Sequence, residues 1–260
     1  MKLLKNNIGQ TYPSLLYKYK GEENYIHLED LIKNKQIFLS TPEILNDPLD
    51  MRFRISERLL REEANKRNFG DAVNEGIDYA IGFEDFRDEH SIYTNEYIRK
   101  HGVLFCMTSD ENNPLLWSYY SNGYRGYRLE FDFSLENNTI QQSIFPVSYV
   151  PELPLIDSND AAFATSFTKL DFWKHENEYR LILIAHEDGK SEYYPIKNTT
   201  LKNITFGYKV PDDVVKKFIE LLFENNMFQT SVNKISFNGL KFGNTIAYNG
   251  KPLSYLNLNV

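Results

Sequence analysis

Residues 176–185, ENEYRLILIA, form the strongest strand signal in the chain. In the apolar half of this segment, the Leu side chains would point to one side of a strand and the Ile side chains to the other. A strand that is apolar on both faces is typical of the interior of a sheet. The chain is therefore expected to fold around a sheet in which this segment is a central strand.

The remaining pattern predicts a mixed architecture. Strands are expected at 17–19, 103–107, 126–132, 192–196, 201–207, 232–237, 245–248 and 252–258, with a helix at 211–225. Strands and helices do not alternate regularly, which argues against a doubly wound parallel sheet. The predicted fold class is α+β, with a mostly antiparallel central sheet and flanking helices. Its 260 residues are expected to form a single domain, 1–260.

Residues 56–100 differ from their surroundings because they are strongly helical and polar. Apolar residues recur there at intervals of three and four, which is the period of a helix with one face in water. The segment is predicted to be a helical insertion. It is a candidate lid or protein-contact surface, although a simple solvated face would give the same pattern.

Composition narrows the classes of function. The chain has 36 Asp and Glu against 29 Lys and Arg, so a generally basic protein that coats nucleic acid is disfavoured. Its only cysteine, Cys106, excludes an internal disulfide and a Cys-rich zinc site, and it is expected to be a small core residue. No apolar run approaches the roughly 20 residues that cross a bilayer, so we expect a cytoplasmic protein without membrane contact.

Several common site motifs are absent from the sequence. It contains no Gly-x-Gly-x-x-Gly, no Gly-x-x-x-x-Gly-Lys-Ser/Thr and no Gly-x-Ser-x-Gly. The five histidines are not spaced by three or four residues, so no helical zinc pair is expected. The sequence therefore gives no support to a Rossmann site, a P-loop or a serine hydrolase, and no metal is expected.

The start of the 176–185 strand carries the most chemistry. Glu176, Glu178 and Arg180 would share one face of a strand. One interpretation is a structural ion pair at the end of a sheet. The other is an acidic pair lining an open cleft, where Glu178 stabilises an oxocarbenium-like cation as the bond from ribose to nicotinamide breaks, and Glu176 positions or deprotonates the nucleophile.

Two further segments could form the walls of such a cleft. Thr108 and Ser109 end a buried strand, and the next helix presents Trp117 and Tyr120 at a spacing of three. Aromatic rings above small hydroxyl groups suit a flat amide ring such as nicotinamide, although helix capping and core packing explain the same residues. The amphipathic segment 17–19 adds Tyr17, Lys18 and Tyr19, which could contact an anionic ligand.

Taken together, these blocks resemble a bacterial family known as domain of unknown function twenty-nine seventy-one. The matching residues are Leu16-Tyr17-Lys18-Tyr19, Leu39-Ser40-x-Pro42-x-x-x-Asn46-Asp47-Pro48-x-Asp50, Asn113-Pro114-Leu115-x-Trp117-Ser118-x-Tyr120 with Gly126, and Trp173-x-x-Glu176-x-Glu178-x-Arg180. This resemblance spans roughly residues 15–255 and implies a standalone cytoplasmic protein. Some members of this family are candidates for phage-defence or toxin loci.

More distantly, the order of these blocks resembles the ADP-ribosyltransferase superfamily. The resemblance implies NAD as co-substrate, a macromolecular acceptor and Glu178 and Glu176 as catalytic residues. The residues proposed to bind NAD are Tyr17, Lys18, Tyr19, Thr108, Ser109, Trp117, Tyr120 and Arg180.

Two hypotheses from other classes stay open. A metal-dependent nuclease could use acidic residues to hold Mg²⁺, namely Asp47, Asp50, Glu176 and Glu178. The two aspartates would equally fix their own loop through side-chain-to-backbone hydrogen bonds. A non-enzymatic sensor would instead bind a protein partner through the helical insertion at 56–100.

Overall fold

A single twisted sheet organises the chain. The computed structural model describes residues 2–67, 71–158, 161, 164–238, 241–244 and 248–249. Within these residues, nine strands form the main sheet, in the order β16 (Lys241–Asn244), β15 (Ser231–Asn238), β14 (Leu201–Phe206), β7 (Tyr127–Asp132), β3 (Leu15–Lys20), β6 (Gly102–Thr108), β12 (Glu178–Ile184) and β8 (Ile144–Pro146), with β17 (Tyr248–Asn249) beside β15. Neighbouring strands are antiparallel except β14 and β15, so the predicted α+β class is confirmed.

The remaining elements are short paired strands and helices around this sheet. The strand pairs are β1 (Leu3–Lys5) with β2 (Thr11–Pro13), β4 (Gln36–Leu39) with β13 (Glu192–Pro195), β5 (Arg54–Ile55) with β10 (Leu155–Ile156), and β9 (Ser148–Val150) with β11 (Thr168–Leu170). The α-helices are α1 (Tyr25–Asn34), α2 (Glu57–Arg67), α3 (Asp71–Ile81), α4 (Glu84–Lys100), α5 (Pro114–Tyr119), α6 (Asn138–Gln142) and α8 (Asp212–Glu224). No helix in the described ranges is both long and apolar enough to span a membrane.

Strand β12 differs from its sequence-based prediction. It lies between β6 and β8, but β8 pairs with it only from Tyr179 to Leu181. Beyond Leu181, β8 no longer pairs with β12, and Ile184 is 84% exposed. The charged beginning of the strand is its most buried part, because Glu178 and Arg180 are 6% and 0% exposed. The prediction that the apolar half would be buried on both faces was therefore wrong.

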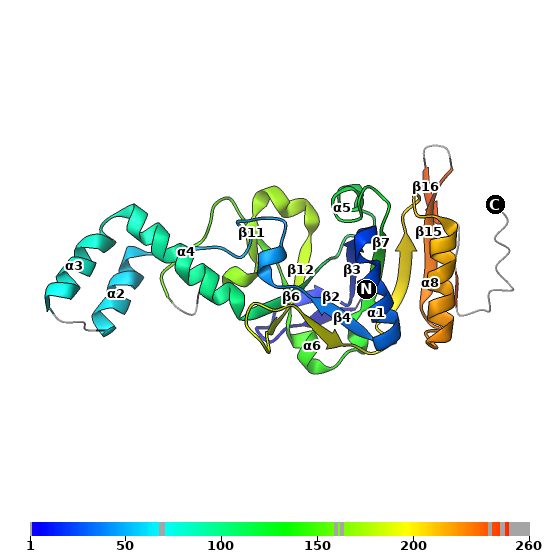
Figure 1. Cartoon of the computed structure of the whole chain (residues 1–260), viewed down its shortest axis with the longest axis horizontal. Coiled ribbons are helices and arrows are strands. Elements are labelled where there is room, and N and C mark those ends of the chain that lie inside the picture. Colours follow the sequence, from blue (N-terminus) through cyan, green and yellow to red (C-terminus); the bar gives the residue numbers. More distant parts are fainter. Residues whose placement is uncertain are drawn as a thin grey trace.

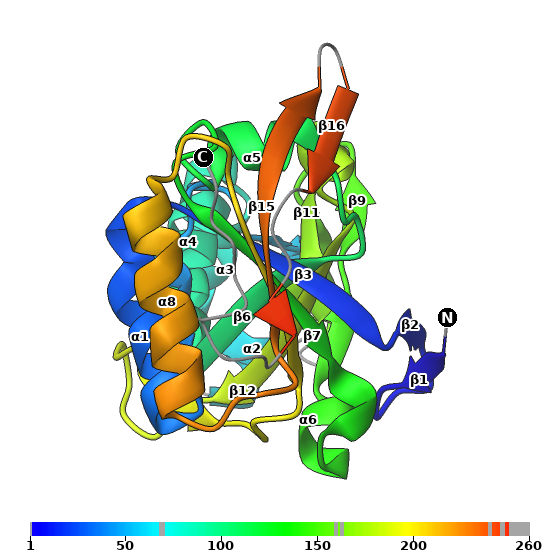
Figure 2. The same ribbon diagram turned by 90° about the vertical axis from the view of Figure 1, so that its right-hand side faces the viewer.

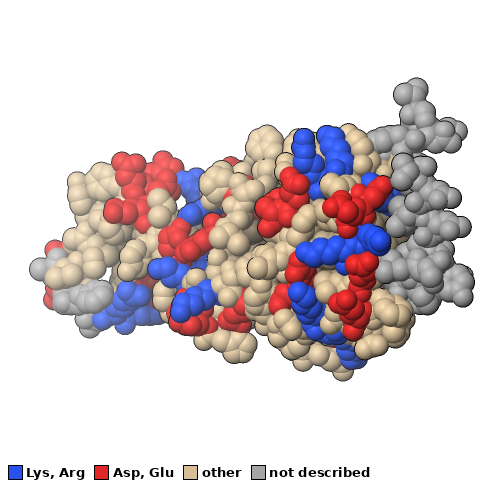
Figure 3. Space-filling model, turned by 45° about the vertical axis from the view of Figure 1, so that its right-hand side comes forward, with Lys and Arg blue, Asp and Glu red and all other residues tan. Residues whose placement is uncertain are grey.

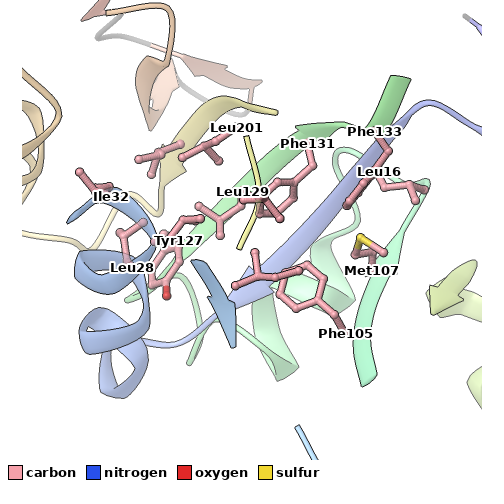
Figure 4. Packing of buried hydrophobic residues seen from close by; sticks show 14 of the residues in the cluster. Leu16, Leu28, Ile32, Phe105, Met107, Tyr127, Leu129, Phe131, Phe133 and Leu201 are labelled. Carbon is pink, nitrogen blue, oxygen red and sulfur yellow. The ribbon is translucent and has the colours of Figure 1, made fainter. Parts of the chain in front are cut away.

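The main core lies between one face of the sheet and helices α1 and α8, which run side by side (Figure 2). Leu28 and Ile32 of α1 pack beside Tyr127 and Leu129 of β7 (Figure 4). Helix α8 buries Val215, Phe218, Ile219 and Leu222 against the same cluster, as its apolar stripe predicted. This packing fixes the sheet on one side and leaves its other face for α5 and the site described below.

Helices α2, α3 and α4 form an arm that extends from the sheet (Figure 1). The arm has a small core of its own, formed by Phe53, Ile55, Leu59, Leu60, Ile81 and Ile156. Helix α4 attaches it to β5, because the Asn95 side chain bonds to the backbone N–H and C=O of Phe53 and the Ser91 Oγ accepts from Ile55 N. Two side chains of α4 thus satisfy backbone groups that a neighbouring strand would otherwise satisfy.

The predicted tail strands are only partly covered by the described residues. The 232–237 strand corresponds to β15. The predicted 245–248 strand falls largely outside the described residues, and the predicted 252–258 strand lies entirely outside them.

Candidate functional site

The site begins where the sheet splits between β3 and β6. These neighbouring strands share one register pair, Tyr17 with Thr108, and then separate. Beyond this pair, the Lys18 ammonium group donates a 2.6 Å hydrogen bond to the Cys106 carbonyl oxygen. Its Nζ also lies 4.2 Å from the centre of the Phe105 ring. A lysine side chain therefore occupies part of the space that a continued backbone ladder would fill.

A cavity of about 300 Å³ opens at this split; we call it the site cavity. Its walls come from β3, β6, α5, the loop 40–50, β11 and the start of β12. The lining residues are Tyr17, Lys18, Tyr19, Lys20, Glu23, Asn24, Ser40, Ile44, Leu45, Asn46, Asp50, Cys106, Met107, Thr108, Leu116, Tyr119, Tyr120, Lys169, Glu176 and Glu178. The structure thus brings together residues from segments that lie far apart in the chain, and most of the predicted site residues are among them.

Three of the predicted residues are cross-strand neighbours. Thr108 of β6 is paired with Tyr17 of β3 on one side and with Glu178 of β12 on the other. Residues directly opposite each other in antiparallel strands point to the same face of the sheet. Tyr17, Thr108 and Glu178 therefore form one row across three strands at the edge of the site cavity.

Glu176 reaches the cavity by a different route from the one predicted. It ends the 3-10 helix η5 (Asp171–Glu176), and β12 begins only at Glu178. Asn177 between them has a left-handed backbone, with φ of 44°. Asn is one of the few residues that tolerate this conformation. The two glutamates are therefore brought together by a helix end and a left-handed turn, and the prediction that both lie on one strand was wrong.

The acidic side chains form a buried network with two cations. Lys169 Nζ lies 2.7 Å from Glu176 Oε2 and 3.6 Å from both Glu178 Oε2 and Asp50 Oδ2. Arg180 Nε donates to Glu178 Oε1 at 2.9 Å, and its Nη2 donates to Asp50 Oδ2 at 2.8 Å. All five residues are at most 6% exposed. Three carboxylates against two cations leave one negative charge in excess when every group is ionised.

Because the carboxylates outnumber the cations, the pKa values of the three acids shift in different directions. Burial opposes ionisation of Glu178, but Arg180 and Lys169 outweigh it and lower its pKa to about 2. Burial and then the neighbouring Glu178 raise the pKa of Glu176 above its usual value. Burial also raises the pKa of Asp50, although Arg180 opposes this shift. The surroundings of Glu178 therefore favour its charged form, whereas those of Glu176 and Asp50 favour protonation relative to an ordinary carboxyl group.

Hydrogen bonds position the acids toward the cavity. The Tyr120 hydroxyl donates to Glu176 Oε1 and accepts a 3.1 Å bond from Asn46 Nδ2. Asp50 Oδ1 is buried and has no hydrogen-bond partner among the described residues. A ligand hydroxyl or amide that reached this oxygen would satisfy it.

Basic groups line the β3 side of the site cavity. Burial lowers the pKa of Lys18 to about 7, and burial likewise lowers the pKa of Lys20. A bound anion would restore the charged form of these amines. The cavity thus has tyrosine rings, carboxylates and titratable amines within one space.

Three predicted ligand-binding residues lie outside the cavity lining. Trp117 is buried and packs against the Tyr19 and Tyr124 rings, with ring centres 5.1 Å and 5.3 Å apart. Ser109 is exposed, and its backbone N–H donates to Asn177 O. Arg180 is fully buried behind the acids it pairs with. Trp117 and Arg180 therefore support the cavity wall, and neither lines the cavity.

Sequence reasoning missed Lys169 and misread two other residues. Lys169 lies in a short strand, and nothing in its segment sets it apart from other lysines on the surface. Asp50 was recognised only as a loop or metal residue, and Cys106 was expected in the core. Cys106 instead lines the site cavity, where burial and then Glu178 raise the pKa of its thiol. The sequence signal that could have identified Asp50 as a site residue was Arg180, because an arginine buried in a sheet needs acidic partners.

The four acids of the nuclease hypothesis are not arranged around an open position. Asp47 Oδ1 accepts the backbone N–H of Leu49 at 2.9 Å, which fixes its own loop. The ammonium group of Lys169 lies among Asp50, Glu176 and Glu178. Within the described ranges, no group of three or more His, Cys, Asp or Glu is arranged to hold a metal ion.

Fold and site together define an α+β protein whose split sheet holds a buried, charged cavity. Comparison of the chain with protein-family models, curated proteins and solved structures finds no match. The two family resemblances seen in the sequence therefore stay predictions, and the functional argument rests on the geometry of the site.

Proposed function

We propose that this chain is an ADP-ribosyltransferase that binds NAD in the site cavity and transfers ADP-ribose to a macromolecule in the cytoplasm. One observation carries the proposal: two acids with opposite shifts in pKa, Glu176 and Glu178, line one cavity together with tyrosine rings. Acids whose surroundings push their pKa values apart are typical of sites that use one as a proton carrier and the other as a fixed charge.

Each acid has a defined part in the proposed reaction. When the bond between ribose C1′ and nicotinamide breaks, its electron pair leaves with nicotinamide, and the ribose becomes an oxocarbenium-like cation. The ionised Glu178, held by Arg180, stabilises that cation without having to reorganise. A nucleophile of the acceptor then bonds to C1′, and its proton passes to Glu176, whose raised pKa suits a proton acceptor.

The rest of the cavity matches the other parts of NAD. Tyr17, Tyr19 and Tyr120 offer ring surfaces for nicotinamide. The orphan Asp50 Oδ1 can accept a hydrogen bond from a ribose hydroxyl or from the carboxamide. Lys18 and Lys20 supply positive charge for the pyrophosphate.

The helical arm is the part of the chain proposed to contact a protein partner or acceptor. The arm exposes several aromatic side chains, namely Tyr79, Phe83, Tyr93 and Tyr97. On the face shown in Figure 3, acidic and basic side chains are intermixed, and no extended basic patch suited to nucleic acid is visible. Such an activity would fit a toxin or phage-defence effector, and arrested growth on expression of the wild type but not of an inactive variant would support that role.

The activity is tested by incubating the protein with labelled NAD and cell lysate. The wild type is expected to release nicotinamide and label an acceptor, and Glu178→Gln is expected to do neither. Because Glu178→Gln disturbs a buried network, Tyr120→Phe provides a second variant that keeps the ring and removes the hydroxyl with its bonds to Glu176 and Asn46. Tyr193→Phe is the matched control, since Tyr193 lies outside the cavity lining, is 42% exposed, and its hydroxyl contacts His27 at 3.2 Å.

The outcomes separate the three classes of function. An absence of both nicotinamide release and label transfer in the wild type rejects the transferase. Degradation of nucleic acid that EDTA abolishes would support the nuclease instead, although the lysine among the acids makes this the less favoured alternative. Capture of a partner through the helical arm, with no turnover of NAD, would support the binding module.

A further inference from the structure

The helical arm contains a second cavity, separate from the proposed catalytic site. This arm cavity has a volume of about 450 Å³, which is larger than the site cavity. Its lining is mostly apolar, formed by Ile55, Leu59, Leu60, Ala64, Ile77, Ile81, Phe86 and Ile156. Its size falls in the range of small-molecule binding sites, roughly 300–1,000 Å³.

Within the described residues, this cavity leaves the apolar side chains that line it with fewer packing contacts than a close-packed core would give them. The residues around it form the only apolar core of the arm that the described residues show. A ligand that filled the space would therefore stabilise helices α2, α3 and α4 together.

Polar and charged residues that line the arm cavity indicate the charge of the ligand. The polar lining residues are Glu63, Arg67, His90, Thr94 and Tyr97. The Glu63 carboxylate is paired with Lys66 at 2.8 Å, so its charge is offset. Arg67 and His90 line the same cavity, and burial and then the positive charge of Arg67 lower the pKa of His90.

We propose that the arm cavity binds a small amphipathic molecule with an apolar chain and an anionic head, the chain lying among Leu59, Leu60 and Ile77 and the head meeting Arg67 and His90. Apolar burial supplies the affinity, and the guanidinium group supplies selectivity for a carboxylate or similar head group. The proposal does not depend on the activity proposed for the site cavity.

The probe is dodecanoate, titrated into the full chain below its micelle concentration and followed by calorimetry and by the thermal midpoint of unfolding. Dodecanol and dodecyltrimethylammonium, which share the chain and differ in the head, are the comparison ligands. Dodecanoate is expected to bind and raise the midpoint, and the cationic ligand to bind at least tenfold more weakly. Equal binding of the anionic and cationic ligands, or no binding of dodecanoate, overturns the proposal.

Two pairs of variants locate the ligand. Ala64→Leu, which puts added carbon atoms into the cavity, should weaken dodecanoate at least tenfold, whereas Asn65→Leu, on the exposed side of the same helix, should not. Arg67→Gln should weaken dodecanoate about tenfold and leave dodecanol unchanged, with Arg58→Gln as its control. The proposal is overturned if Ala64→Leu binds dodecanoate as tightly as the wild type does. It is also overturned if the chain self-associates and Ala64→Leu abolishes this self-association, because a second copy of the chain would then be the occupant.

Discussion

Arg180 and Asp50 form a buried ion pair of 2.8 Å, although 130 positions separate them in the chain. Arg180→Leu would leave Asp50 and Glu178 without their main cationic partner. Breaking a buried pair from one side costs about 3–5 kcal/mol, and the free energy of unfolding should fall by that amount in urea denaturation.

The control for this variant is an ion pair at the surface. Lys217 lies 2.6 Å from Glu29, and the lysine is 61% exposed. Lys217→Leu should lower the free energy of unfolding by less than about 1 kcal/mol. Similar losses in the two variants would show that Arg180 is not held in a desolvated network.

The ionised form of Glu178 should make stability depend on pH in the acid range. Its folded-state pKa of about 2 lies below the ordinary value of 4.5. The stabilisation from Glu178 is therefore complete above the ordinary value and is lost as the pH falls toward 2. Urea denaturation at a series of acid pH values should show a steeper loss for the wild type than for Glu178→Gln. Parallel curves for the two proteins would contradict the lowered pKa.

Lys18 should make the binding of NAD depend on pH near neutrality. Burial lowers its pKa from 10.5 to about 7, so the amine is charged below that pH and increasingly neutral above it. Affinity for the pyrophosphate should therefore fall as the pH rises from about 6 to 8. Lys18→Arg keeps its charge over this range and should lose the dependence, as calorimetric titration at several pH values would reveal. Unchanged pH dependence in that variant would place the titrating group elsewhere.

Asn177 should be replaceable only by residues that accept its backbone conformation. With φ of 44°, it joins the end of η5 to the start of β12. Asn177→Gly should fold normally, whereas Asn177→Val should lose about 1–2 kcal/mol of unfolding free energy because a β-branched residue is strained there. The valine variant should also lose activity, since Glu176 and Glu178 both depend on this turn. Equal stability of the two variants would argue against a left-handed turn.

The period of the apolar residues predicted much of the fold. It located β6, β7 and α8, whose apolar residues pack in the main core, and β3, whose Tyr17 and Tyr19 pack in a second cluster with Trp117. The same reasoning located β12 but not its burial, which depends on how far the partner β8 extends and not on the strand's own apolar residues. The sequence of one strand does not predict the length of the strand that pairs with it.

The site was predicted in part for a related reason. Tyr17, Thr108, Tyr120 and the two glutamates were found because they flank recognisable elements. Lys169 was missed because its role comes from contacts with Glu176, Glu178 and Asp50, which only the folded chain brings together. A lone lysine in a short strand carries no local pattern that distinguishes a buried ion-pair partner from a surface residue.

Helix α4 connects the two cavities. Phe86 and His90 line the arm cavity, and nine residues beyond His90 the Arg99 guanidinium donates to the carbonyl oxygens of Asp50 and Pro42. Helix α4 is thus bonded directly to the backbone of the residue that pairs with Arg180. If a ligand of the arm cavity moved α4, thermodynamic linkage would require that a ligand of the site cavity change the affinity of the arm cavity by the same factor as the reverse.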